Sequence, residues 1–505
     1  MAHITLKKKM RLSKSKYLTG LQCSKALWIN IHKRDVIPPI SPGTQSIFDM
    51  GHEVGELAQT RFSGGTLISE AHYEIPQAEK STHKAIVAGA SAIYEATFTH
   101  KDVSVRLDIL VHVEGKGDDA IWDMVEVKSG TRVKDVNVCD MSIQRWVLEG
   151  AGLKIRKCFL MHLNRRYVRK GALDVNELFT LSEVTDRVAD IIHEVPVRVK
   201  EMREVLAQEE MPEIRLGAHC NKPNDCLLLA YCQKGLPEFS IYNLPRLSWE
   251  KIASLQDQKI TKAADIPADF PLNGTQQLHV DVAKSGKGVM DGKFIQEYLG
   301  KLQYPLYYLD FETCMSGLPS FDGLSPYDTL TFQASLHVQK KPGGKLEHFE
   351  FLGDAKSDPQ AKVIDFLLKN IGPTGSIVAY NAPYEIRCIE DLAKRFPKKA
   401  QKLRSLKDRF WDLIVPFKQR KFVHPKQNGS ASLKSVLPAF DPKMSYSDMK
   451  IGCGDDASIA YQQMMTGKLS EDQFQDARKN LLEYCKQDTL GMVVILDRLK
   501  SLKSS

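Results

Sequence analysis

Residues 304–313 read Tyr-Pro-Leu-Tyr-Tyr-Leu-Asp-Phe-Glu-Thr, and the rest of the chain is interpreted around them. The stretch is apolar and aromatic, which is typical of a strand. Successive side chains of a strand point to opposite faces, so Asp310 and Glu312 are expected side by side. Two carboxylates in apolar surroundings repel each other, and a divalent metal held by oxygen ligands offsets that cost. The stretch predicts a metal site, and the alternative is an exposed strand edge with two solvated acids.

Two later stretches supply further acids. Residues 481–488 belong to a pattern of one amphipathic helix, on which Tyr484 and Asp488 are four apart and share a face. Between this helix and the strand, Pro383 suits a helix start that presents Glu385 in its first turn. The acids therefore recur on a strand, at a helix start and on a helix near the C-terminus.

This order, Asp-x-Glu, then Asn-x-x-x-Glu, then Tyr-x-x-x-Asp, resembles the DEDD exonucleases of the RNase H-like superfamily, in the subgroup with a tyrosine in the third motif. The resemblance covers about residues 300–505. It implies a site for two Mg²⁺ or Mn²⁺ ions about 3.5–4 Å apart, with Tyr484 orienting the attacking water. The ligands it implies are Asp310, Glu312, Glu385 and Asp488. Glu385 departs from the family, which usually has Asp there, and Ser432-Leu433-Lys434 receives no catalytic role.

The composition is that of a globular protein. Hydrophobic residues make up 43% and charged residues 26% of the 505 residues, a length that allows about three domains. There is no run of about 18 apolar residues and no signal-peptide pattern, so we expect a cytoplasmic protein. The formal charge of +8 is a mild indication of a polyanionic partner.

Four of the ten cysteines form a pattern. Five residues separate Cys220 from Cys226 and Cys226 from Cys232, and Cys23 lies almost 200 residues upstream. In a reducing compartment such residues are thiols or metal ligands rather than disulfides. Three close thiols and a distant one can form a four-sulfur site, either a 4Fe-4S cluster or a structural zinc site. The alternative is a set of unrelated core cysteines.

A second acidic group is expected on a hairpin. Residues 103–110 alternate like a strand, and residues 122–130 read like its partner. Glu126 and Lys128 share one face of the second strand, and Asp108 comes from the first. Together they offer oxygen ligands and a cation, which metal-dependent phosphodiester cleavage requires. The alternative is an ion pair on a solvated face.

The order of residues in the first half carries a second resemblance. That order is Cys23, His52, Asp108, Glu126, Lys128, Gln144, Cys220, Cys226 and Cys232. It resembles the RecB-type nucleases of the PD-(D/E)xK superfamily, in the branch clasped by an iron-sulfur cluster, such as the CRISPR-associated RecB-like nucleases and the AddB type.

This second resemblance covers about residues 10–235. It implies that His52, Asp108 and Glu126 bind metal, with the Val127 carbonyl assisting. Lys128 would position the nucleophile. Gln144 would open a helix motif that contacts nucleic acid, although Leu148 stands where the motif has tyrosine.

We therefore expect an α/β protein with a PD-(D/E)xK restriction-endonuclease-like core over residues 10–235, a helical connector over 236–300 and an RNase H-like DEDD exonuclease domain over 301–505. The expected activity is hydrolysis of DNA phosphodiester bonds, in single strands or at ends, with DNA favoured over RNA as the partner. The expected cofactors are Mg²⁺ or Mn²⁺ and a 4Fe-4S cluster. The competing hypothesis is a nucleic-acid-binding protein with one or both sites inactive.

Overall fold

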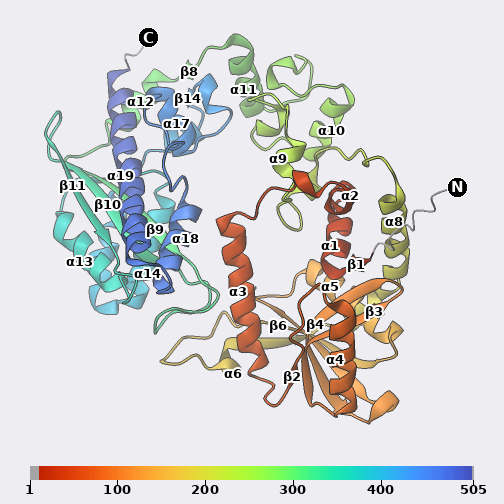
Figure 1. Cartoon of the computed structure of the whole chain (residues 1–505). Coiled ribbons are helices and arrows are strands. Elements are labelled where there is room, and N and C mark those ends of the chain that lie inside the picture. Colours follow the sequence, from red (N-terminus) through yellow and green to blue (C-terminus); the bar gives the residue numbers. More distant parts are fainter. Residues whose placement is uncertain (1–10, 503–505) are drawn as a thin grey trace. The chain divides into compact units, whose positions relative to one another are not determined.

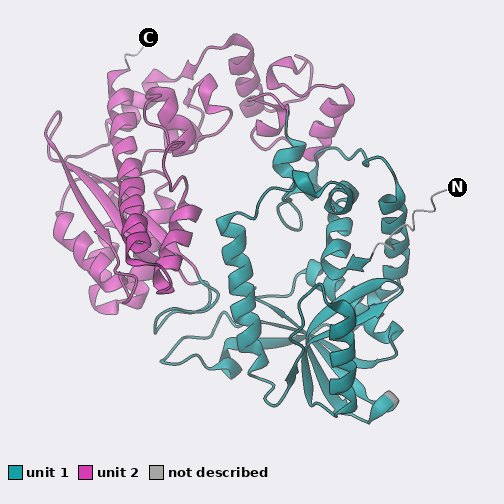
Figure 2. Ribbon diagram, in the orientation of Figure 1, with its two compact units in different colours: residues 1–234, 316–327 teal, residues 235–315, 328–505 magenta. Residues whose placement is uncertain are grey.

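A computed structural model of the chain describes residues 11–502, without the side chain of Asp118. Residue 10 and residues 503–505, which end two of the expected domains, lie outside this range. The chain has a mixed α/β fold, as the sequence predicts (Figure 1). It divides into two compact units, with residues 235–315 and 328–505 in unit 2 and the remainder, including residues 316–327, in unit 1 (Figure 2).

Unit 1 begins with short helices and continues as a strand-rich body. Its elements are β1 (Leu12–Ser13), α1 (Lys14–Gln22), α2 (Ser24–His32), α3 (Pro42–Gln59), β2 (Thr66–Leu67), α4 (Ile75–Val87), β3 (Ala92–His100), β4 (Val103–Glu114), β5 (Ile121–Lys128), α5 (Asp135–Gly150), β6 (Lys154–Leu163), α6 (Val175–Leu178), β7 (Phe179–Glu183), α7 (Thr185–Ile192), α8 (Val195–Ala207) and α9 (Leu229–Cys232).

The described strands of unit 1 form one seven-stranded sheet in the order β2-β3-β4-β5-β6-β7, with β1 beside β4. β4 pairs antiparallel with β3 and β5, which confirms the expected hairpin, and α5 connects β5 to the parallel strand β6. A large apolar core that includes side chains of α5 lies on one face of the sheet. On the other face, Val54 and Ala58 of α3 pack against Val125 and Val127. Because alternate residues of β5 enter that second core, Glu126 and Lys128 point the other way.

Unit 2 contains residues 236–300 and the second sheet. Its elements are α10 (Trp249–Asp257), α11 (Gly274–Ser285), β8 (Val289–Met290), α12 (Gly292–Leu299), β9 (Leu306–Cys314), β10 (Leu330–Gln339), β11 (Leu346–Leu352), α13 (Gln360–Asn370), β12 (Ser376–Ala379), α14 (Pro383–Arg395), α15 (Ala400–Arg404), β13 (Phe410–Asp412), α16 (Val415–Lys418), β14 (Phe422–Val423), α17 (Leu433–Phe440), α18 (Gly454–Met465) and α19 (Glu471–Ser501).

The main sheet of unit 2 has five strands in the order β11-β10-β9-β12-β13. β9, β10 and β11 are antiparallel to their neighbours, whereas β12 is parallel to β9 and β13 is parallel to β12. Leu309 and Phe311 enter a core with α13 and α14, so Asp310 and Glu312 lie on the opposite face. The long helix α19 runs beside β9 and β10 (Figure 1).

Residues 316–327 connect β9 to β10 but belong to unit 1. Tyr327 donates its hydroxyl to the Ser129 carbonyl at 2.7 Å, directly after Lys128. Arg169 donates its backbone N–H to Leu324 and its side chain to the Pro319 carbonyl. The connection between two strands of unit 2 is thus held by backbone groups and one arginine side chain of unit 1.

No helix within residues 11–502 combines the length and the apolar character needed to cross a membrane.

Candidate active sites

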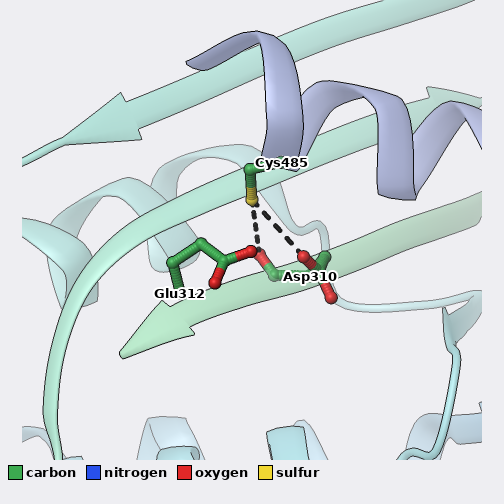
Figure 3. Close-up of side chains that lie close together, drawn as sticks. All are labelled: Asp310, Glu312 and Cys485. Atoms are coloured by element: carbon green, nitrogen blue, oxygen red, sulfur yellow. Dashed lines mark hydrogen bonds between the residues drawn. The ribbon is translucent and has the colours of Figure 1, made fainter. Parts of the chain in front are cut away.

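The strand β9 carries the acids of unit 2 into a buried cluster. Asp310, Glu312 and Cys485 lie close together (Figure 3), and each places one ligand atom within 4.8 Å of the other two. The Cys485 thiol donates to Asp310 Oδ2 at 3.4 Å. The sequence predicts the two acids but not the cysteine, which follows Tyr484 on α19.

Buried polar contacts fix α19 against the sheet. Gln333 Nε2 donates to the Leu481 carbonyl at 2.7 Å, and the hydroxyls of Ser335 and Thr489 lie 2.8 Å apart. Gln333 and Ser335 stand opposite Glu312 and Asp310 in the register of β10 and β9. These contacts therefore bring the buried segment of α19 that contains Tyr484, Cys485 and Asp488 to the strand that carries the acids.

The fourth acid comes from the start of α14. Glu385 lies in the first turn of this helix, after Pro383, as the sequence predicts. Its side chain is buried, and its Oε2 atom has no hydrogen-bond partner in the described part of the chain. Burial raises the pKa of Glu385, and the charge of Asp310 raises it further. Glu385 therefore lies within electrostatic range of β9.

Burial raises the pKa of every carboxyl group in this cluster, and the charge of a neighbouring carboxylate adds to it for three of the four. For Asp310, Glu312 and Glu385 the pKa lies well above the ordinary value, first through burial and then through a neighbouring carboxylate. Burial also raises the pKa of Asp488, to about 6, against the opposing effects of a hydrogen bond from Tyr446 and the charge of Lys434. A cluster that resists its own ionisation in this way is suited to a bound cation.

The sequence did not identify two further residues at this site. The Tyr446 hydroxyl donates to Asp488 Oδ1, and its ring meets that of Tyr484 edge to face. Lys434 Nζ lies 5.4 Å from the centre of the Tyr446 ring and 5.3 Å from that of Tyr484. Both residues lie in segments that precede α19 in the chain, and no fixed spacing relates them to the motif on α19.

The raised pKa values predict how metal and pH affect stability. A carboxyl group whose pKa is raised in the folded state stabilises that state fully at pH values below its unfolded-state pKa, which is 3.8 for Asp488. It loses this contribution as the pH rises through its folded-state pKa of about 6. The metal-free protein should therefore lose stability over this range, while Mn²⁺ binding competes with protons and strengthens. At about 100 times its Kd, Mn²⁺ should raise the Tm of unit 2 by about 5–10 °C at about pH 8 and by less at about pH 5.

Differential scanning calorimetry with Mn²⁺ or with a chelator measures this effect. The Asp310→Asn variant, which removes one ligand, is the control and should show a smaller increase. An increase that is equal at both pH values would contradict the competition between metal and protons.

In unit 1, Glu126 is the centre of a charged network. Lys128 Nζ donates to Glu126 Oε1 at 2.6 Å and to Asp140 Oδ2 at 2.8 Å, and Lys14 Nζ donates to Glu126 Oε1 at 2.8 Å. Burial acts to raise the pKa of Glu126, but the two lysines outweigh it and hold that pKa well below its usual range. Glu126 is therefore ionised, and its charge is already compensated by protein cations.

Asp108 lies beside this network on β4. Its Oδ2 accepts the Val127 N–H at 2.7 Å, and continuing the register from Ile109 opposite Val125 places it opposite Glu126. Burial and then the Glu126 charge raise the pKa of Asp108 to about 7. The predicted neighbours Asp108, Glu126 and Lys128 thus meet, and Asp108 is the acid of this set whose ionisation is disfavoured.

Three residues of this site were missed by the sequence analysis. Lys14 and Asp140 join the network described above, and Glu95 of β3 occupies the register position opposite Asp108. Glu95 has a φ of 59°, a left-handed conformation that is uncommon for a side chain other than glycine, and pairs with Arg106 at 3.2 Å. An acid inside the apolar strand 92–98 was a usable signal for Glu95.

Gln144 and His52 take different positions around this site. The sequence predicts that Gln144 contacts nucleic acid, but its side chain is fully buried and its amide donates to Glu126 Oε2 at 2.9 Å and Asp140 Oδ1 at 3.1 Å. His52 is exposed on α3, and within residues 11–502 it makes no hydrogen bond or ion pair with Asp108 or Glu126. Its charge does act on the pKa of Glu95, which places it in the surroundings of the site.

The four patterned cysteines come together in unit 1. Cys23 lies between α1 and α2, and after burial the pKa of Cys226 is raised by the charges of Cys23, Cys220 and Cys232. Around tetrahedral zinc, sulfur atoms lie about 3.8 Å apart. Within residues 11–502 no three of these sulfur atoms approach one another within 4.8 Å, so their spacing is wider than a compact zinc site requires.

Parts of the chain are similar to a family model and to proteins of two mycoplasmas. Residues 307–432 match the model of a domain of unknown function (DUF2779), a range that includes Asp310, Glu312 and Glu385 but ends before α19. The uncharacterized protein MG366 of Mycoplasma genitalium is 25% identical over 243 residues, 44% of this chain and 36% of that protein. Its homologue in Mycoplasma pneumoniae is 25% identical over 227 residues, 41% of this chain and 34% of that protein. The chain thus spans about a third of the length of these relatives.

Proposed function

We propose that this protein is a metal-dependent nuclease with two active sites, a DEDD-type exonuclease site in unit 2 and a RecB-type PD-(D/E)xK site in unit 1. The observation that carries the proposal is the buried convergence of Asp310, Glu312, Glu385 and Asp488, whose pKa values are all raised. Acids arranged in this way are costly for a protein that does not bind a cation.

The donor atoms of unit 2 fit Mg²⁺ or Mn²⁺. The ligands are carboxylate oxygens, which these hard ions prefer, and Glu385 Oε2 is buried without a partner. Bound ions would activate water and stabilise the leaving oxygen in phosphodiester hydrolysis. The chain itself would hold the ions through the four acids, while Tyr484 and Tyr446 position Asp488.

The arrangement of strands supports an RNase H-like core for unit 2. In chain order within the main sheet, the strands lie as 3-2-1-4-5, with three antiparallel strands followed by two parallel ones. The acids lie on the first strand, at the start of the helix after the fourth, and on the last helix. This is the order of the three motifs that the sequence analysis identified.

Unit 1 supports the second site more indirectly. Asp108, Glu126 and Lys128 lie together on a hairpin, and Asp108 retains a raised pKa that a metal ion would lower. Lys14 and Lys128 already neutralise Glu126, so the lysine contacts would loosen when Glu126 takes a metal. Lys128 would then be the cation that faces the nucleophile and the phosphate.

For the four cysteines we propose a 4Fe-4S cluster, with structural zinc as the alternative. A 4Fe-4S cluster does not require its sulfur ligands to lie within 4.8 Å of one another, and within residues 11–502 no three of these four do. The described chain contains only free cysteines, which suits the reducing cytoplasm proposed as the protein's location.

Cys226→Ser is expected to abolish the absorption near ~400 nm and the iron content of anaerobically purified protein. Cys388→Ser, at a buried cysteine in unit 2, is the matched control and should leave both unchanged. Stoichiometric zinc without iron in the unchanged protein would overturn the cluster.

One observation favours the alternative, a nucleic-acid-binding protein with an inactive site. Leu148 is fully buried in the core of unit 1, at the position where the family motif has a tyrosine that contacts DNA. A site without that contact would bind its substrate less well even with its metal ligands in place.

The test is cleavage of end-labelled single-stranded DNA and RNA with Mg²⁺ or Mn²⁺. Asp108→Asn silences unit 1 while retaining an oxygen that accepts the Val127 N–H, and Asp310→Asn silences unit 2. Each single variant should lose one part of the product pattern and the double variant should lose all cleavage. Cleavage that survives in the double variant would overturn both sites, and a chain that binds DNA without cleaving it would establish the alternative.

A further inference from the structure

The ammonium group of Lys434 is an unexpected cation near the acids of unit 2. Lys434 is the second residue of α17 and is partly exposed. Its charge lowers the pKa of both Glu312 and Asp488, so it lies within electrostatic range of two of the four acids.

Lys434 is held without an ion pair. Its Nζ donates to the Gly452 carbonyl and lies over the rings of Tyr446 and Tyr484. Within residues 11–502 it has no carboxylate partner within 4.0 Å, in contrast to Lys128 and Lys14 of unit 1. An ammonium group has three donors, and the carbonyl uses one of them.

The surroundings of Lys434 hold its ammonium group in one position. A carbonyl and two aromatic faces fix the ammonium group by a hydrogen bond and by cation–π attraction, without neutralising it. Tyr484 and Tyr446 also adjoin Asp488, so the same two rings fix the cation beside a metal ligand. If the four acids are neutralised by divalent ions, the lysine charge keeps no carboxylate partner within residues 11–502.

We propose that Lys434 binds a non-bridging oxygen of the substrate phosphate at the unit 2 site, where the substrate is a single-stranded nucleic acid. This inference rests on the proposed nuclease function of unit 2. A phosphate supplies the anion that the fixed ammonium group lacks, and lysine is a common point-charge ligand for phosphate.

The experiment measures steady-state cleavage of a single-stranded oligonucleotide with Mn²⁺ in the Asp108→Asn background, over a series of salt concentrations. Lys434→Gln is expected to reduce kcat/KM by about 10- to 100-fold, chiefly through KM, since it removes a charge-assisted hydrogen bond. The slope of log KM against log salt should fall by about 0.7, the contribution of one phosphate contact on a single strand. Lys434→Arg keeps the charge and should keep the slope.

Lys362→Gln is the matched control, since Lys362 pairs with Asp354 at an exposed site in unit 2 and should leave the slope unchanged. The Mn²⁺ concentration that gives half of the maximal rate should not rise in Lys434→Gln, because the substitution removes a cation that repels the metal. A structural defect at the site would raise this concentration. An unchanged slope in a cleaving protein overturns the role of Lys434. If the Asp108→Asn parent shows no cleavage that Asp310→Asn removes, the proposed function of unit 2 fails and the inference fails with it.

Discussion

Cleavage by unit 2 is expected to fall at least about 1000-fold when Asp310 is replaced by asparagine in a chain already carrying Asp108→Asn. Asparagine keeps the shape of the side chain but offers a neutral amide oxygen in place of a carboxylate. Asp310 is the acid whose charge acts on both Glu312 and Glu385, so it is central to the cluster. Rates with Mn²⁺ on an end-labelled single strand measure the loss.

The same substitution is expected to stabilise the metal-free protein. Asp310 is half-buried, and its ionised form is opposed by Asp488, so a neutral side chain removes a repulsion that grows as the pH rises. The Tm in chelator at about pH 8 should therefore rise while activity disappears.

Asp354→Asn is the control for this prediction. Asp354 accepts hydrogen bonds from Ser357 and Lys362 at the surface of unit 2, which help to hold its pKa well below the ordinary value. Its replacement should leave cleavage unchanged and should not raise the Tm. If Asp310→Asn lowers the Tm of the metal-free protein, Asp310 contributes to folding and the view of a repelling cluster is wrong.

Glu126→Gln is expected to abolish cleavage by unit 1 and, unlike Asp310→Asn, to destabilise the protein. The carboxylate accepts from Lys14, Lys128 and Gln144, and after its replacement Asp140 would be the one acid of this network left to the two lysines. Breaking a buried pair of this kind typically costs about 3–5 kcal/mol. Urea unfolding monitored on the Asp310→Asn background measures the loss of stability.

Glu183→Gln is the matched control in unit 1. Glu183 pairs with Lys157 at 2.9 Å, and both side chains are more than 40% exposed, so its loss should cost little stability. A Glu126 variant as stable as the Glu183 variant would show that the two lysines do not depend on Glu126.

Local patterns predicted the acids of both units. The alternation of residues 304–313 placed Asp310 and Glu312 on one face, and the four-residue spacing of Tyr484 and Asp488 placed them on one helix face. Pro383 predicted the helix start that presents Glu385. Each prediction needed only the periodicity of one element, which a sequence displays directly.

The residues that complete the sites could not be predicted in this way. Lys14 and Glu126 are 112 residues apart, and they meet because of the packing of unit 1. Lys434 reaches the acids only because α17 packs against α19, and an isolated Ser-Leu-Lys run shows nothing of that contact. Asp140 is the exception, since it precedes Gln144 by four residues on α5 and shares its helix face.

The place of residues 316–327 in unit 1 has a consequence for synthesis on the ribosome. When the chain has been made as far as Lys234, unit 1 still lacks this segment, which arrives about 90 residues later. At a typical rate of about 5–20 residues per second, the nascent unit waits about 5–20 seconds for the tyrosine that binds the Ser129 carbonyl. By then β9, with Asp310 and Glu312, has already been made. The N-terminal unit is therefore completed during translation only after the first strand of the C-terminal sheet has been synthesised.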